Sequence, residues 1–332
     1  METQTSEAEK EMREWCVALP KVELHAHLNG SVRNSTLLEL AKELGDKGVI
    51  VLEDVKDVIM KSHKSVEDVD VLLNNEKLSC TPMSDLGGDT KRKKIYVRLL
   101  LSIDRHETTS AALDTVNLAM EMKDQGVIGI DLSGNPVVGE WETYLPALEH
   151  AKELGIPTTI HCGEVPNRKE IQAMLDFCPQ RLGHVCCLDD EEWKKLKSSV
   201  IPVEICLTSN VMTGGTPSLE RHHFGLYLTM QNPKSLINKT NPSKHLNIPS
   251  FRTCAADLYN AKHPLSICTD DCGLFSTSLS NEYYLAASTF GLSKTELFRL
   301  AQGAVEFMFA DDEVKKSLRA VFERAAAERL TS

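Results

Sequence analysis

Two histidines one residue apart, His25 and His27, end the first apolar run of the chain, VELHAHL. Alternate side chains of a β-strand leave on the same face, so both imidazoles can point at one metal ion. His161 in TTIHCGE and the pair Asp270 and Asp271 in SICTDD end two further apolar runs. Because these runs lie far apart in the sequence, the pattern favours a fold in which the ends of several strands converge on one site.

These runs belong to a regular alternation of β-branched segments and amphipathic helical patterns. Strand, helix and strand in turn indicate a parallel sheet built of βα units. Polar residues cluster where the strands end, the place where α/β barrels keep their chemistry. We therefore predict an α/β fold, a TIM-type (β/α)8 barrel, in a single domain over residues 1–332. The expected strands are 22–28, 95–104, 127–134, 158–164, 181–187, 202–210 and 265–271, and the expected helices include 109–126, 141–155 and 294–330.

Some parts of the chain do not fit a complete barrel. Seven strand ends are clear where a barrel needs eight, and between His27 and Asp104 only the short runs 49–52 and 69–73 can stand in for the missing strand. Residues 225–256 are rich in Asn, Pro, Ser and Lys and predict an irregular insertion. The polar, charged residues 1–14 are expected to be disordered.

Composition excludes several classes of protein. The chain has 332 residues, of which 42% are hydrophobic and 26% charged, as in an ordinary globular protein. Its formal net charge of −11 argues against a general nucleic-acid or anionic-membrane surface. No apolar run approaches the roughly 18 residues of a membrane-spanning helix. The ten cysteines include no CxxC pair, which favours reduced thiols in a cytosolic protein. We expect a monomer that acts on a small molecule.

His25, His27, His161 and Asp270 offer three neutral imidazoles and one carboxylate. This set of ligands suits Zn²⁺ with an open position for water. Water bound there has a pKa of about 7 instead of 15.7, so hydroxide exists at neutral pH. Each histidine alone is more often a buried, hydrogen-bonded side chain. Together, the strand ends favour one zinc ion per chain.

Further polar residues lie at the same strand ends. Glu164 follows His161 by three residues, where a carboxyl could protonate a ring nitrogen while a neighbouring carbon is attacked. His184 in RLGHVCC is placed to orient the attacking water. Asp271 could hold the substrate or help to move a proton, and Gly134 leaves its backbone accessible to a flat ring. A loop glutamate such as Glu164 is, taken alone, usually just solvated.

The motifs VELHAHLNGS, DLSGNP, HCGE, RLGH, LTSN and ICTDD resemble, in this order, those of the adenosine deaminase family. Within that family, ADLYNAKHPL, CLTSN and STSLSNEY are similar to the plant type of adenosine deaminase-like proteins that act as N6-methyl-AMP deaminases. The resemblance implies a barrel of the metal-dependent hydrolase kind. It also implies a cytosolic zinc aminohydrolase that converts N6-methyl-AMP to IMP and methylamine.

The resemblance also implies roles for the residues at the matching positions. His25, His27, His161 and Asp270 would bind zinc. Glu164 would donate a proton to N1 of the purine, and His184 would orient the hydroxide. The implied substrate contacts are His27 beside the purine, Asp104, Gly134 at N3 and Asp271 at N7.

Asn29 helps to choose the substrate. The resemblance implies that adenosine deaminases, which act on the nucleoside, have the sequence HLDG at this place. Their aspartate would contact the ribose 5′-hydroxyl group. A carboxylate would repel a 5′-phosphate by about 4 kcal/mol at 4 Å and an effective dielectric constant of about 20. The neutral amide of Asn29 removes this repulsion, which favours a purine nucleoside monophosphate.

The chain departs from the family's pattern in two places. It lacks the second barrel strand with its Leu-Arg-Thr-Thr-Pro-like end, and residues 225–256 are extra. Both are typical of a splice variant or an imperfect gene model. The alternatives are therefore an adenosine or AMP deaminase, another metal-dependent amidohydrolase, and a catalytically impaired isoform that keeps the metal site. The HxE and PCxxC motifs of the other class of zinc deaminases are absent from the sequence.

Overall fold

The computed structural model describes residues 6–32, scattered positions between 36 and 47, 96–226 and 263–329. The chain divides into two compact units, one of Met1–Ser31 with Leu100–Ser332 and one of Val32–Leu99. All the helices and strands described below belong to the first unit, except that Leu99, the first residue of strand β1, is assigned to the second. In the second unit, Lys47 and Glu43 form an exposed ion pair of 2.6 Å. The expectation of a single domain over residues 1–332 stays a prediction.

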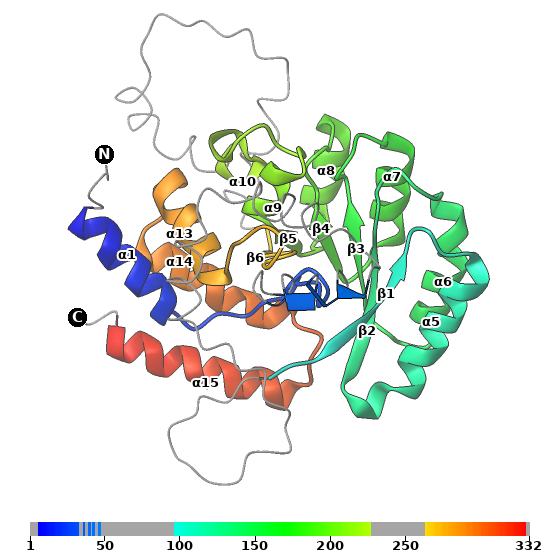
Figure 1. The fold of residues 1–332 in the computed structure, drawn as a ribbon, viewed down its shortest axis with the longest axis horizontal. Coiled ribbons are helices and arrows are strands. Elements are labelled where there is room, and N and C mark those ends of the chain that lie inside the picture. The colour runs from blue at the N-terminus through cyan, green and yellow to red at the C-terminus, as the bar shows by residue number, and fades with distance from the viewer. Residues whose placement is uncertain are drawn as a thin grey trace, which may run out of the picture. The chain divides into compact units, whose positions relative to one another are not determined.

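Among the described residues, the first unit is built on a six-stranded sheet with the strands in sequence order from β1 to β6. The pairs from β2 to β6 are parallel, and at least one helix separates each strand from the next (Figure 1). This arrangement confirms the predicted α/β fold of βα units. The strands are β1 (Leu99–Asp104), β2 (Val127–Ser133), β3 (Thr158–Cys162), β4 (Arg181–His184), β5 (Val203–Ile205) and β6 (Leu265–Ile267).

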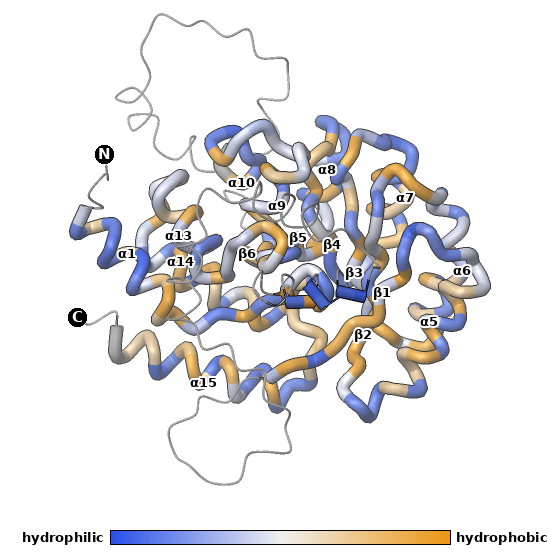
Figure 2. Tube along the Cα trace, viewed as in Figure 1, coloured by the Kyte–Doolittle hydropathy of each residue, from blue (hydrophilic) through white to orange (hydrophobic). Residues whose placement is uncertain are grey.

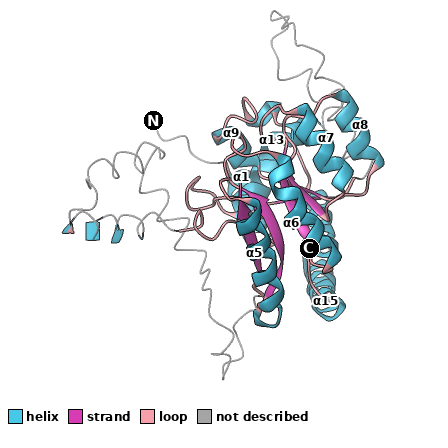
Figure 3. Cartoon of the chain, turned by 90° about the vertical axis from the view of Figure 1, so that its right-hand side faces the viewer, coloured by secondary structure: helices cyan, strands magenta, loops and turns pink. Residues whose placement is uncertain are grey.

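Several helices begin where the sequence supplies a capping side chain. Asp189 accepts hydrogen bonds from amides in the first turn of α8, and the Glu192 carboxylate in that turn accepts one from the Asp189 amide. Ser293 and Glu296 form the same arrangement at α14. Figure 3 shows α5 and α6 beside the sheet. The longer helices are α5 (Thr109–Glu121), α6 (Trp141–Glu153), α7 (Arg168–Phe177), α8 (Asp190–Ser198), α13 (Leu279–Phe290), α14 (Lys294–Gly303) and α15 (Asp312–Arg329); the shorter ones are η2 (Lys123–Gln125), α9 (Leu207–Met212), η3 (Leu219–Arg221), α10 (His223–Leu226) and η4 (Ala304–Phe307).

The expectation of disorder over residues 1–14 was wrong for the part that the structure describes. Residues Glu7–Ala18 form helix α1, with Ser6 and Glu9 in a capping box at its start. Cys16 is fully buried in the core, and α1 packs against α13. The tertiary contact with α13, distant in sequence, stabilises a segment whose composition alone indicates a free terminus.

Two expected strands are shorter than their sequence runs. In the segment 22–28 only Ala26 is paired, through an isolated parallel bridge to Asp270. In the run 202–210, β5 ends at Ile205 and α9 begins at Leu207. The buried Glu282 carboxylate accepts hydrogen bonds from the amide and the hydroxyl of Thr208, which satisfies the first turn of α9 and favours helix over strand there.

Several sequence expectations fall outside the described residues. These are the runs 49–52 and 69–73 and all of the insertion 225–256 after Leu226, which ends α10. Within the described ranges no strand lies between Ala26 and Leu99, so the absence of a second barrel strand stays a prediction. None of the described helices is both long and apolar enough to cross a membrane.

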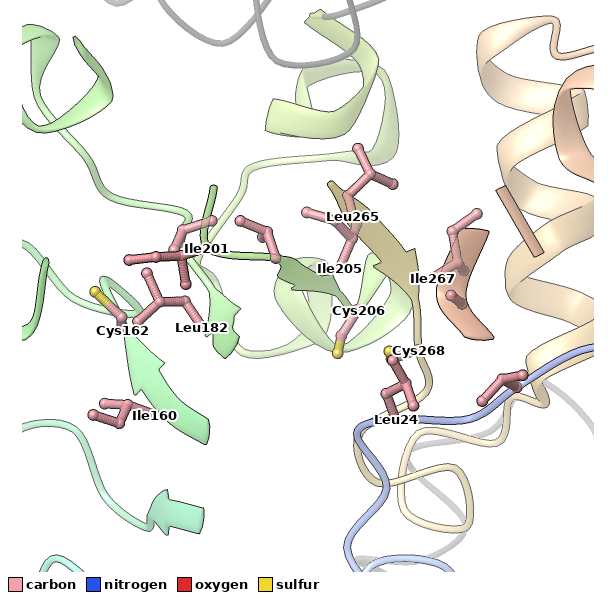
Figure 4. Close-up of a cluster of buried hydrophobic side chains, with 14 of the residues drawn as sticks. Leu24, Ile160, Cys162, Leu182, Ile201, Ile205, Cys206, Leu265, Ile267 and Cys268 are labelled. Carbon is pink, nitrogen blue, oxygen red and sulfur yellow. The ribbon is translucent and has the colours of Figure 1, made fainter. Parts of the chain in front are cut away.

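The two faces of the sheet differ in character. On one face, a row of residues paired across the strands is apolar and nearly inaccessible, and it joins the buried core that Figure 4 shows in part. This apolar row is Leu132, Ile160, Leu182, Val203 and Leu265. The residues that alternate with it along the strands place polar side chains on the opposite face.

Figure 2 shows that helix α15 alternates between hydrophilic and hydrophobic residues, as a helix buried on one side does.

Ile160 tests whether this apolar row stabilises the fold. Its side chain is fully buried in β3, so Ile160→Ala should lower the free energy of unfolding by about 2–5 kcal/mol, because it removes buried methyl groups and leaves a cavity. Denaturant unfolding measures the change. Val200→Ala is the control, since Val200 is 85% exposed and should change stability by less than about 0.5 kcal/mol. Equal effects of the two substitutions would contradict the assignment of this row to the core.

Candidate metal centre

Four side chains that are distant in sequence meet at one end of the sheet. One ligand atom from each of His25, His27, His161 and Asp270 lies within 4.8 Å of the others. The His27 Nε2 atom is 3.1 Å from His161 Nε2 and 3.0 Å from Asp270 Oδ1. Three imidazole nitrogens and one carboxylate oxygen at these distances fit a single divalent cation such as Zn²⁺.

Backbone hydrogen bonds hold two of the contributing segments together. The Asp270 amide donates to the His25 carbonyl at 2.8 Å, and the His27 amide donates to the Asp270 carbonyl at 3.1 Å. These bonds flank the bridge at Ala26, so both histidines are positioned against the end of β6. Asp270 itself has a φ of 64°, in the left-handed region that non-glycine residues seldom adopt. The chain therefore turns sharply at the point where it presents this carboxylate.

Three of the four ligands, His25, His161 and Asp270, are held from behind by a further hydrogen bond. Glu204 Oε2 lies 2.7 Å from His25 Nδ1, and His161 Nδ1 lies 3.0 Å from the Leu132 carbonyl oxygen and 3.2 Å from Asp131 Oδ1. These acceptors keep a proton on Nδ1, which leaves the Nε2 lone pair of each ring free to bind a cation. The carboxylate of Asp270 accepts a hydrogen bond from Ser209.

The parallel register explains why Glu204 reaches His25. His161, Gly183 and Glu204 pair in turn across β3, β4 and β5, so they share the polar face of the sheet. A Cβ atom added to Gly183 would lie 2.8 Å from the His25 ring, so only glycine leaves room for that ring. Arg181, two residues earlier on β4, forms a buried ion pair with Glu204.

The carboxylates around the imidazoles dominate the electrostatics of the centre. Burial lowers the pKa of His25, but Asp270 and Glu204 outweigh burial and raise it well above the usual value. Burial opposes the charge of His161 as well, yet Asp131 raises its pKa to about 8. Such a centre attracts positive charge, and binding of a cation would release the protons that these rings otherwise retain.

The Nε2 atom of His25 gives the sharpest test of fit. It is buried and lies 3.3 Å from Asp270 Oδ1, but within the described ranges it makes no hydrogen bond. A buried nitrogen in that state costs free energy unless something else satisfies it. The atom faces the other three ligand atoms, so a metal ion among them would satisfy it. The residues present therefore fit a bound divalent cation.

Two of the expected catalytic residues adjoin this cluster. The His184 ring centroid lies 4.8 Å from that of His25 and 4.9 Å from that of His161. Its Nε2 atom is 3.9 Å from Glu164 Oε2. Burial lowers the pKa of His184 to about 4, so the ring is neutral at pH 7. Asp271 follows a ligand, and burial together with Asp270 raises the pKa of its carboxyl.

The remaining expected residues lie at the end of β1, directly after β2 and in the loop that follows His27. Gly134 has a φ of 103°, and a Cβ atom added to it would lie 3.1 Å from Asp104 Oδ1. The Asp104 carboxylate is exposed and accepts hydrogen bonds from the amide and ring of His106. Asn29 is also exposed, next to Gly30, where an added Cβ would collide with Asp271. The structure thus brings Gly134 to Asp104 and the Asn29 loop to Asp271.

Sequence reasoning assigned no role to several residues that support the ligands. Asp131 and Glu204 are charged residues inside apolar strand runs, a position where charge is rarely buried without a partner. This position in the sequence could have identified Asp131 and Glu204 as candidate functional residues. Ser209 and Asn210 carry no comparable signal, because LTSN reads as a polar strand end and its contacts arise only once α9 forms.

Comparisons with known proteins show what the chain is similar to. The family model described as adenosine deaminase matches residues 83–245 and 254–324. The N6-mAMP deaminase of Arabidopsis thaliana is 46% identical, with 96% of this chain and 100% of that protein covered. The human N6-Methyl-AMP deaminase is 33% identical, with 91% of this chain and 92% of that protein covered. A crystal structure of Arabidopsis ADAL complexed with IMP is 48% identical, has a TM-score of 0.75, and matches over 95% of this chain and 99% of that one.

Glu204 is the residue whose removal tests the support of the cluster. Glu204→Gln keeps the shape of the side chain but removes the charge behind His25, so affinity for Zn²⁺ should fall about 10–100-fold. Competition with a chromophoric chelator measures this, and circular dichroism checks that the variant is folded. Glu306→Gln, which alters an exposed carboxylate paired with Arg319, is the matched control. If both variants bound Zn²⁺ as the unaltered protein does, Glu204 would have no part in holding the centre.

Proposed function

This chain belongs to the adenosine deaminase family, and on that premise we propose that it is a zinc-dependent aminohydrolase that converts N6-methyl-AMP and water to IMP and methylamine. The observation that carries the proposal is the convergence of His25, His27, His161 and Asp270 within 4.8 Å, with His184 packed against them. The fold and the matched relatives support the same reaction class.

The four ligand side chains would hold one Zn²⁺ ion per chain. The ion would supply a water molecule with a pKa lowered to about 7, and hence a nucleophile at neutral pH. The chain's contribution is to fix the ligands. Glu204 and Asp131 orient the rings of His25 and His161 through their Nδ1 atoms.

Glu164 is the residue that we assign to proton transfer. Its carboxyl follows the ligand His161 by three residues, and Gly163 between them has a φ of 64°, which turns the chain at this point. We propose that Glu164 protonates N1 of the purine while oxygen attacks C6. One proton of the attacking water reaches N1 through Glu164 as the C6–O bond forms. The second passes from the new hydroxyl group to the amine nitrogen, the C6–N bond breaks, methylamine leaves, and C6=O and N1–H of IMP remain. His184 would orient the attacking oxygen beside Glu164.

The purine and its phosphate would lie among the exposed loop residues. We assign N7 to Asp271, N3 to the backbone of Gly134, and a further substrate contact to Asp104, with His27 beside the ring. The Arabidopsis protein whose structure was determined with IMP supports a nucleoside monophosphate. The neutral side chain of Asn29 supports the same class, because it does not repel a 5′-phosphate.

Two alternative functions can be tested against this proposal. The first is the deamination of adenosine or AMP, which would use the same metal centre. A catalytically impaired isoform would keep the metal centre without turnover, and the sequence favours it through the missing second strand. The scattered cysteines, with no CxxC pair, support reduced thiols and hence the cytosol. We further propose a monomer.

Purified protein loaded with zinc should release methylamine from N6-methyl-AMP, and Glu164→Gln should keep the zinc but lose about 100-fold or more in kcat, because the proton donor is gone. Metal analysis and amine release are measured on the same samples, with Glu142→Gln, which alters an exposed carboxylate, as the control. If the protein turned over adenosine in preference to N6-methyl-AMP, the substrate would be a nucleoside and not a nucleotide. Zinc binding with no turnover of either compound would favour the impaired isoform.

Asn29→Asp should change substrate preference toward the nucleoside. A carboxylate at this position repels a 5′-phosphate, so kcat/KM for N6-methyl-AMP should fall by at least about tenfold while that for N6-methyladenosine should not. The effect should weaken as ionic strength rises, because Asn29 is exposed and salt screens exposed charges. Asn29→Gln, which adds length without charge, is the matched control. Equal losses for both substrates would contradict the role of Asn29.

A further inference from the structure

A chain of hydrogen bonds runs from the backbone of α10 to the candidate centre. Its members are the Phe224 amide and the side chains of His222, Asn210 and His184. We infer that Asn210 and His222 are positioning residues that hold His184 in the tautomer with its proton on Nε2. His184 would then act as a hydrogen-bond donor and not as a base. The consequence for catalysis rests on the proposed function, whereas the tautomer does not.

The direction of the chain is fixed at its far end. A backbone amide can only donate a hydrogen bond, and the Phe224 amide lies 3.0 Å from His222 Nδ1. His222 Nδ1 must therefore accept, and it cannot carry a proton. Burial of the whole side chain lowers the pKa of His222 well below its usual value, in agreement with a neutral ring. The single proton of His222 is then on Nε2.

Asn210 passes this direction on to His184. His222 Nε2 lies 3.0 Å from Asn210 Oδ1, so the oxygen accepts and the orientation of the amide group is fixed. The other end of that amide, Nδ2, can only donate, and it lies 2.8 Å from His184 Nδ1. His184 Nδ1 must accept, and its ring carries the proton on Nε2.

The Nε2 atom of His184 points into the centre. It is buried and lacks a hydrogen-bond partner in the described part of the chain. The charged and titratable groups facing the ring are Glu164, 3.9 Å from Nε2, together with His25, His161 and Asp270. An N–H donor with no protein partner beside a carboxylate suits an oxygen of water or substrate. This leaves Glu164 as the group that moves protons.

The chain of hydrogen bonds is built into the core. His222 is fully buried, and Asn210 and His184 are at most 2% exposed. His223 stacks on His222 with ring centroids 4.2 Å apart, which fixes the plane of the His222 ring. Three buried polar side chains that satisfy one another in a single direction specify one arrangement, because reversing the Asn210 amide would place two donors or two acceptors together.

Asn210→Asp is the substitution that reverses the polarity at His184. A carboxylate accepts from both neighbours, so it draws the His184 proton to Nδ1. The Nε2 atom then faces the centre as an acceptor, and the donor is lost. The kcat/KM of the variant should therefore fall by about 100-fold, because nothing at this position donates a hydrogen bond to the attacking oxygen.

A second pair of variants separates positioning from packing. His222→Leu removes both contacts, so Asn210 is free to reverse and His184 should show a mixture of tautomers. His222→Gln can accept from the Phe224 amide and donate to Asn210, so it should restore the tautomer and kcat/KM relative to the leucine variant. The control is His263→Gln, since His263 is a buried histidine that contacts the Ile201 carbonyl, away from this chain of hydrogen bonds.

Nitrogen-15 NMR of histidine-labelled, zinc-loaded protein reports the tautomer directly, and His184→Gln identifies the signals. The proposal predicts a protonated Nε2 and an unprotonated Nδ1 on His184, reversed or doubly protonated in Asn210→Asp and restored in His222→Gln. A proton on Nδ1 in the unaltered protein would overturn the proposal, as would an Asn210→Asp variant with unchanged signals and unchanged kcat/KM. If the predicted tautomers were found without turnover of N6-methyl-AMP, the positioning role would stand and the proposed function would fail.

Discussion

The Nδ1 atoms of His25 and His161 donate hydrogen bonds to buried acceptors, and these bonds set the orientation of the candidate centre. Glu204 and Asp131 hold these atoms, and the Nε2 atoms therefore face one another and Asp270. Without the acceptors, either ring could exchange tautomers or rotate, and the lone pairs would no longer converge. The arrangement of the polar face, the glycine at position 183 and the ion pair of Arg181 with Glu204 all serve this orientation.

The backbone is strained at several residues that carry or adjoin the side chains of the candidate centre. Asp270, His184 and Val185 have positive φ values of 64°, 65° and 52°. For residues with a Cβ such conformations cost about 1–3 kcal/mol each and persist only where the surroundings enforce them. Here the hydrogen bonds of Asp270 with the 25–27 segment and of His184 with Asn210 enforce them. The strain lies at the ends of β4 and β6, where the side chains must turn toward the centre.

Much of the centre could be predicted because its residues interrupt apolar runs at strand ends. The spacing of His25 and His27 and the polar ends of SICTDD and TTIHCGE identified all four side chains that the structure brings together. The strand assignment of 22–28 failed because the segment is paired only at Ala26. Helix α9 and helix α1 were missed because their partners, Glu282 and α13, lie far away in the sequence. The hydrogen bonds from Phe224 to His184 were invisible for the same reason: their direction depends on contacts between α9, α10 and β4.

X-ray absorption at the zinc edge, on purified protein with its metal content determined, tests the central claim most directly. The account predicts one zinc ion per chain surrounded only by nitrogen and oxygen ligands at about 2.0–2.2 Å. Loss of this signal in a His25→Ala, His161→Ala double variant would agree with the assigned ligands. Sulfur ligands at about 2.3 Å, which the chain's ten cysteines could supply, would contradict it, and so would the same spectrum in the double variant.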